Sequence, residues 1–123
     1  MNEKMSGNEK LKTRYLKDLT GIWHITSMSS WDKEYFDAEV KAHIRIENNG
    51  TGEFQFGLVY GEICGEFKSA EKIFDFTWDG NDECDDANGD GWTKLKGADI
   101  LEGEIRFHSG DHSTFLAKRV GKK

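Results

Sequence analysis

The sequence predicts an all-β fold: an antiparallel meander barrel of about eight strands, with one short helix before the first strand. Three observations predict it. Apolar and polar residues alternate with a period of two through most of the chain after residue 20. Turn-forming segments recur about every 8–12 residues. The 123 residues include 14 glycines and no proline, so glycine makes the turns and every strand residue keeps its backbone donor.

The first expected element is an amphipathic helix at residues 8–19. Its apolar residues recur at helical spacing: Leu11, Tyr15, Leu16 and Leu19. Ser6 and Glu9 have the spacing of a capping box, and Gly21 follows where a helix can stop. We expect this helix to pack against an open end or an edge of the barrel. The ends of the chain, residues 1–7 and 121–123, are expected to be frayed.

Eight strands are expected after the helix, at residues 21–31, 40–47, 53–58, 62–67, 73–78, 92–95, 101–108 and 113–120. Reversals are expected at residues 48–52, at Gly61, at residues 69–71 and at residues 109–111. The segment between residues 78 and 92 is expected to be a solvated, glycine-rich loop. A meander of this kind closes on itself because closure removes the exposed edges of the sheet.

The inward positions of these strands are rich in aromatic rings, namely Phe54, Phe56, Phe67, Phe74, Phe76, Trp78 and Phe107. An eight-stranded barrel is just wide enough to be filled by side chains or to hold one small ligand. Gly65, Gly103 and Ala42 could leave a gap between the rings. A packed centre is favoured over a pocket, and a pocket fits the barrel mouth better than the centre.

Composition excludes several classes of partner. Lys and Arg number 17 and Asp and Glu 23, which gives a net charge of −6 and opposes binding to nucleic acid or to an anionic membrane. No apolar stretch is long enough to span a membrane or to serve as a secretion signal, so we expect one cytoplasmic domain over residues 1–123. Cys64 and Cys84 are expected to be free thiols. A monomer and a homodimer are equally compatible with the sequence.

Two motifs carry a family resemblance. Gly21, Ile22 and Trp23, directly after the helix, resemble the G-x-W signature of lipocalins and related calycin barrels, in which the Trp closes one barrel end. Residues 78–83, 89–92 and 108–115 are similar to a family of small uncharacterised bacterial proteins, and that similarity extends over most of residues 19–119. It implies one barrel-like domain and no particular reaction. The calycin resemblance implies a ligand held by the barrel.

Six acidic residues lie between residues 79 and 90 without a Lys or Arg among them: Asp79, Asp82, Glu83, Asp85, Asp86 and Asp90. Asp86, Asn88, Asp90 and Gly91 match the start of a calcium-binding loop. The bidentate Glu that completes such a loop is replaced by Gly97. A solvated loop is therefore favoured over a calcium site, and no resident metal or cofactor is expected.

The aromatic and acidic residues together predict a binding site at the barrel mouth. Trp31 and Trp92 lie beside turns and can form a rim, whereas Trp23 and Trp78 are typical of core residues or barrel-end plugs. The remaining candidates are acidic or imidazole groups near predicted turns: Asp79, Asp82, Glu83, His108 and Asp111. The function that this site predicts is non-catalytic binding of a small polar or amphipathic molecule, with a cationic molecule as one suitable ligand.

Two other classes stay open. A small-barrel cyclase, isomerase or hydrolase could use Asp79, Glu83, His108 or Asp111 as acid–base groups. His108, Asp111 and His112 could also form a metal set. A protein-interaction module could use the helix or an outer strand face. The sequence contains neither the nucleophile elbow of a serine hydrolase nor a phosphate-binding glycine loop.

Overall fold

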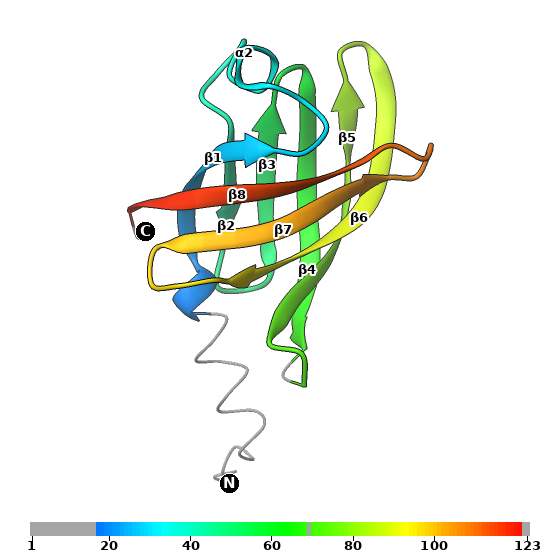
Figure 1. The fold of residues 1–123 in the computed structure, drawn as a ribbon. Coiled ribbons are helices and arrows are strands. Elements are labelled where there is room, and N and C mark those ends of the chain that lie inside the picture. Colours follow the sequence, from blue (N-terminus) through cyan, green and yellow to red (C-terminus); the bar gives the residue numbers. More distant parts are fainter. Residues whose placement is uncertain (1–16, 69, 122–123) are drawn as a thin grey trace, which may run out of the picture.

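A computed structural model describes residues 17–68 and 70–121. Eight antiparallel strands form a closed barrel in chain order, and the last strand pairs with the first (Figure 1). The strands are β1 (Gly21–Met28), β2 (His43–Ile46), β3 (Thr51–Phe56), β4 (Val59–Lys68), β5 (Ile73–Asp82), β6 (Asp85–Leu95), β7 (Ile100–Phe107) and β8 (His112–Gly121). The predicted all-β, eight-stranded meander barrel is thus confirmed.

The helices differ in part from the prediction. Residues 17–19 are helical, and the rest of the predicted helix at residues 8–19 lies outside the described residues. A short helix, α2 (Lys33–Phe36), was not predicted because four residues are too few to show helical periodicity. Asp32 caps it by accepting a hydrogen bond of 3.1 Å from the Tyr35 backbone N–H.

The second predicted reversal is misplaced. The chain turns at Gly57 and Leu58, where Gly57 has a φ of 56°, and Gly61 lies inside β4. A glycine is needed at position 61 for a reason other than a turn. Its inward side faces the rings of Phe54 and Trp78, and a Cβ there would lie 2.6 Å from the Phe54 ring.

The largest correction concerns the acidic segment, which is not a loop. β5 continues to Asp82 and β6 begins at Asp85, so only Glu83 and Cys84 form the turn, with a φ of 61° at Glu83. The two strands pair through this whole segment. Side chains near its tip are exposed on both faces because the hairpin extends beyond the core. For that reason the tip of the hairpin, residues 81–86, shows no alternation of apolar and polar residues.

The barrel interior is packed. Six of the seven predicted inward rings are at most 3% exposed, and Phe107 packs against this core from a partly buried position. The glycines do not leave a gap: a Cβ at Gly65 would lie 2.6 Å from the Phe76 Cβ, and one at Gly103 would lie 2.8 Å from the Phe115 ring. Large rings fill the space that these glycines provide.

The lower end of the barrel holds the start of β1, the β2–β3, β4–β5 and β6–β7 turns and the end of β8. Trp23 is fully buried there and donates its indole N–H to the Leu19 carbonyl at 2.9 Å. The Arg119 guanidinium lies 4.1 Å from the centre of the Trp23 ring and donates to the carbonyls of Asp18 and Thr20. This stack closes the lower end.

The upper end holds the β3–β4, β5–β6 and β7–β8 turns and the connection between β1 and β2, which carries α2 (Figure 1). Phe36 of α2 is buried. Trp31, in the same connection, packs on Phe56 and Phe107 with ring centroids 5.0 and 6.1 Å apart. The connection therefore covers the aromatic interior at this end. Among the described residues, no helix has the length and apolar character needed to cross a membrane.

Candidate ligand-binding groove

The candidate site lies at the upper end, where β6 extends beyond β7. The pairing of these strands begins with Gly89 opposite Phe107. One further bond joins them, from the His108 N–H to the Asn88 carbonyl at 2.8 Å. In the described part of the chain no strand pairs with the β7-facing edge of residues 85–87, which leaves a notch between the β5–β6 hairpin and the β7–β8 turn.

Two hollows with shared lining residues lie along this part of β6. One has a volume of about 410 Å³ and is bordered by Asp82, Asp85 and Asp86 of the hairpin. The other has a volume of about 570 Å³ and is bordered by Asp79 and Asp90. Asn88, Phe107 and His108 line both. We call the two hollows together the upper groove.

The upper groove is negatively charged without a balancing cation. Asp79, Asp82, Asp85 and Asp86 are exposed, and none of them forms an ion pair with another residue of the described ranges. Carboxylates that border the same hollow repel one another, and solvent ions or a bound cation offset that repulsion. The groove is thus suited to a positively charged group.

Asp90 differs from these four because it has a partner. Arg106 donates to both of its carboxylate oxygens, from Nε at 2.8 Å and from Nη2 at 3.1 Å. This bidentate contact holds the pKa of Asp90 below its usual value and raises that of Arg106. Asp90 therefore ties β6 to β7 and is not available as a free carboxylate.

The floor of the upper groove is aromatic. Phe107 is partly buried, and its ring packs edge-on against Trp78 at 5.1 Å and near Phe56 at 6.5 Å. Trp78 itself is only 3% exposed and fixes its indole by donating to the Arg106 carbonyl at 3.1 Å. The ring of Phe107 is consequently held by the core and offers a rigid apolar surface beside the carboxylates.

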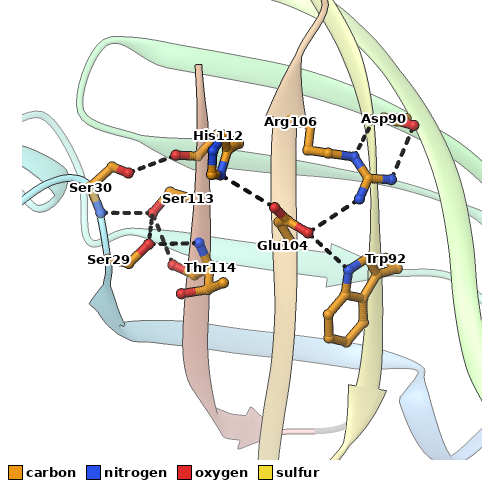
Figure 2. A network of polar contacts seen from close by, with 9 residues as sticks. All are labelled: Ser29, Ser30, Asp90, Trp92, Glu104, Arg106, His112, Ser113 and Thr114. Atoms are coloured by element: carbon orange, nitrogen blue, oxygen red, sulfur yellow. Dashed lines mark hydrogen bonds and ion pairs between the residues drawn. The ribbon is translucent and has the colours of Figure 1, made fainter. Parts of the chain in front are cut away.

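A polar network covers the outer face of β6, β7 and β8 next to the groove (Figure 2). Glu104 is at its centre and accepts hydrogen bonds from the Trp92 indole and from Arg106, both at 3.2 Å. The His112 ring lies 3.4 Å from the other Glu104 oxygen. The backbone carbonyl of His112 accepts a hydrogen bond from the Ser30 hydroxyl at 2.6 Å. This network links the start of the β1–β2 connection to the strand that borders the groove.

Sequence reasoning missed Glu104 and Arg106. Both occupy polar positions of an alternating strand, and such positions predict only that the side chains face solvent. Their partners become visible once the register places Trp92 opposite Glu104 and Asp90 opposite Arg106. The strand that supplies both partners had been predicted mostly as loop.

The structure brings together some of the predicted site residues. Asp79, Asp82 and His108 line the upper groove, and Trp78 lines its buried floor. The others lie elsewhere. Glu83 and Asp111 are exposed in turns and line neither hollow, Trp31 covers the interior, Trp92 lies on the outer face, and Trp23 is buried at the opposite end. Of the four proposed acid–base groups, Asp79 and His108 line the same hollow, and Glu83 and Asp111 line neither.

The metal hypotheses find no support in the geometry. Asp86, Asn88 and Asp90 project from one face of an extended strand, where alternate residues are about 6.6 Å apart, and they do not wrap around a point as in a calcium loop. His112 faces Glu104 instead of joining His108 and Asp111. Within the described ranges no three His, Cys, Asp or Glu side chains are placed to hold a metal ion.

Comparison with known proteins identifies no relative. No family model, no curated protein and no solved structure matches the chain. The function has to be argued from the geometry and charge of the groove.

Proposed function

We propose that the protein binds a small cationic amphipathic molecule, a primary amine on a short apolar body, in the upper groove. The observation that carries this proposal is the set of four carboxylates that line the two hollows beside Phe107 and form no ion pair with another described residue. An ammonium group offsets the repulsion among the carboxylates, and the apolar body gains contact with Phe107. The polar groups of Asn88 and His108 can accept or donate further hydrogen bonds.

A calycin-like relationship is part of this proposal. Trp23, the last residue of the Gly21-Ile22-Trp23 motif, closes the lower barrel end under Arg119, which supports this relationship. In this barrel the centre is filled by rings, so the ligand would sit at the rim rather than deep inside. Binding at an open rim is expected to weaken as salt is added, because exposed charges are screened over about 10 Å at 0.1 M salt.

The test uses three probes with the same ring and different heads: phenethylamine, 2-phenylethanol and phenylacetate. Titration is followed by amide proton and nitrogen shifts. Phenethylamine is expected to bind with a Kd on the order of 1 mM, a typical affinity for so few atoms. The shifted amides should include Ala87, Asn88 and His108. The other two probes should leave these amides unchanged.

A matched pair of variants assigns the binding to the groove. The triple variant Asp82→Asn, Asp85→Asn, Asp86→Asn should weaken phenethylamine about tenfold. The control Glu34→Gln, Glu39→Gln, Glu66→Gln removes the same charge from exposed acids that line neither hollow. It should bind like the parent. Equal binding of the alcohol and the amine, or equal loss in both triple variants, would refute the proposal.

A further inference from the structure

The outer face of the sheet carries a hollow that shares no lining residue with the upper groove. Its volume is about 320 Å³, at the lower end of the range of roughly 300–1,000 Å³ for small-molecule pockets. Trp92 of β6, Glu102 of β7 and Leu116 of β8 are among the residues that line it. Each of the three lies between two buried residues of its strand, so its side chain points away from the core. We call this site the outer hollow.

The indole ring of Trp92 gives the outer hollow a flat apolar surface with a fixed orientation. Its N–H donates to Glu104 at 3.2 Å, and Arg106 donates to the same carboxylate oxygen at 3.2 Å (Figure 2). Because this N–H is the only polar group of the side chain, the rest of the partly buried ring is left for apolar contact. The electron-rich face of an aromatic ring attracts the weakly positive hydrogens of C–H groups.

The far border of the outer hollow is formed by β1. The register of β1 against β8 shifts between Ile25 and Ser27, and a β-bulge of this kind bends its strand. Ser27 follows the bulge, pairs with Leu116 and lines the hollow. The hollow is therefore bordered by four strands, from β6 to β1 around the barrel closure.

Polar groups surround the apolar surface of the outer hollow. Ser27 and Thr114 are exposed, and both bring a hydroxyl that donates and accepts hydrogen bonds. Glu102 forms no ion pair with another residue of the described ranges, so its two carboxylate oxygens are acceptors for a ligand. A ligand that fits has one apolar face and several hydroxyl groups around it.

The charges around the outer hollow largely balance, in contrast to those of the upper groove. Glu104 lies against Arg106, and Lys94 stands opposite Glu102 in the register of β6 and β7. Neither a cation nor an anion gains much from a site with this balance. The charge pattern favours an uncharged ligand.

The volume of the hollow limits the ligand to one ring. A cavity of about 150 Å³ holds one benzene molecule. A volume of 320 Å³ thus accommodates a six-membered ring together with its hydroxyl groups, whereas a second ring would project into solvent.

We propose that the outer hollow binds a single pyranose sugar. One C–H face of the sugar ring packs on Trp92, and its hydroxyl groups hydrogen-bond to Glu102 and Thr114. This site lies on the outer face of the sheet and does not depend on amine binding in the upper groove. The protein then has two sites, one for a cationic amphipathic molecule and one for a neutral polyhydroxylated ring.

The test compares glycosides with probes that lack one property of a sugar. The glycosides are the methyl β-pyranosides of glucose, galactose and mannose. Cyclohexylmethanol has a ring of the same size but one hydroxyl, and tetramethylammonium is a cation that an aromatic ring can attract. At least one glycoside is expected to shift the indole N–H of Trp92 and the amides of Glu102 and Thr114, with a Kd on the order of 10 mM.

The other two probes should leave these three signals unchanged. No shift with any of the glycosides at about 100 mM, or shifts as large with cyclohexylmethanol or tetramethylammonium, would overturn the inference. The upper groove is read through the amides of Ala87 and His108 with phenethylamine, so a failure at one site leaves the result at the other intact.

Two variants and one control assign the binding to the outer hollow. Glu102→Ala should weaken the glycoside about fivefold, and Trp92→Leu should weaken it about tenfold or more. The control Glu62→Ala removes an exposed glutamate from β4, outside the hollow, and it should bind like the parent. If Trp92→Leu does not fold, the surface variant Glu102→Ala decides, and equal binding by Glu102→Ala and Glu62→Ala would show that the proposed site is wrong.

Discussion

Individual glycines allow the large rings of the barrel interior to pack closely. Gly61 lies on β4, where the neighbouring strands place Phe54 and Trp78 against each other with ring centroids 5.1 Å apart. A Cβ at this position would lie 2.6 Å from the first ring and 2.8 Å from the second. Both rings are themselves packed on all sides, so they cannot move away at low cost.

Gly61→Ala is therefore expected to destabilise the protein by about 1–3 kcal/mol, the usual cost of overpacking a core. The ordinary effect of replacing a strand glycine has the opposite sign, a gain of about 0.5–1 kcal/mol from reduced chain entropy. Urea denaturation followed by tryptophan fluorescence measures the difference.

Gly97→Ala is the matched control for this substitution. Gly97 lies in the β6–β7 turn, and an added Cβ would meet nothing within 4 Å. Its stability should equal that of the parent or exceed it by up to about 1 kcal/mol. If both substitutions change the urea midpoint equally, the nearby rings of Phe54 and Trp78 are not the reason why position 61 requires glycine.

At the scale of elements, one ion pair between described residues, Asp90 with Arg106, joins the side chains of the β5–β6 hairpin to β7. Arg106 and Asp90 are 40% and 51% exposed, so their contact is screened by solvent in spite of its bidentate geometry. On the tip side of this pair, the described residues of the two strands are joined only by the pairing of Gly89 with Phe107 and by the hydrogen bond from the His108 N–H to the Asn88 carbonyl. The hairpin that borders the groove is thus fixed near its base and solvated at its tip.

The stability that this tie contributes should depend on pH. Arg106 lowers the pKa of Asp90 in the folded state, so the contribution is complete above the usual Asp value of about 3.9 and is lost as the pH falls through the lowered value. Asp90→Asn should cost about 0.2–1 kcal/mol at pH 7 and nothing once the parent carboxyl is protonated. Denaturation curves from pH 7 to pH 2 measure this.

Asp79→Asn provides the comparison. Asp79 is exposed and has no ion pair in the described part of the chain, so its neutralisation should leave stability unchanged or raise it slightly at pH 7. If Asp79→Asn lowered the free energy of unfolding as much as Asp90→Asn does, the bidentate contact with Arg106 would make no specific contribution to stability.

The same hairpin shows why sequence reasoning recovered the barrel but only part of the site. Strands that face the core alternate visibly, as Val59 to Phe67 do, because one face is buried. Residues 79–91 show no alternation of large apolar and polar residues. Residues 81–86 are exposed on both faces, and the less exposed positions on one face nearer the barrel are small: Gly80, Ala87, Gly89 and Gly91. The notch beside Asn88 depends on how far β6 extends past β7, and no local pattern encodes that length.

At the scale of the whole molecule, the closed sheet is held by contacts between residues far apart in sequence, most clearly between β1 and β8. Such a topology folds slowly, in milliseconds to seconds, because long loops must close before their contacts form. The chain has no proline, however, so it lacks the usual source of folding phases on the scale of about 10–100 s.

Refolding is therefore expected to be complete without a proline-limited phase. In a double-jump experiment the amplitude of the main phase should not depend on how long the protein was held unfolded. Slow phases that grow with the unfolding time would contradict this expectation. A variant with a proline introduced at Gly97, in the β6–β7 turn, should add the phase that the parent lacks, at the cost of the long hydrogen bond of 3.4 Å from the Gly97 N–H to the Ile100 carbonyl.

The unpaired edge of β6 at residues 85–87 has a consequence for self-association. An open strand edge is a template on which another copy of the chain can add a strand, and this one carries acidic side chains at Asp85 and Asp86. Two such edges repel each other through these carboxylates. The double variant Asp85→Asn with Asp86→Asn removes that protection from this edge, so its aggregates should grow from the hairpin tip.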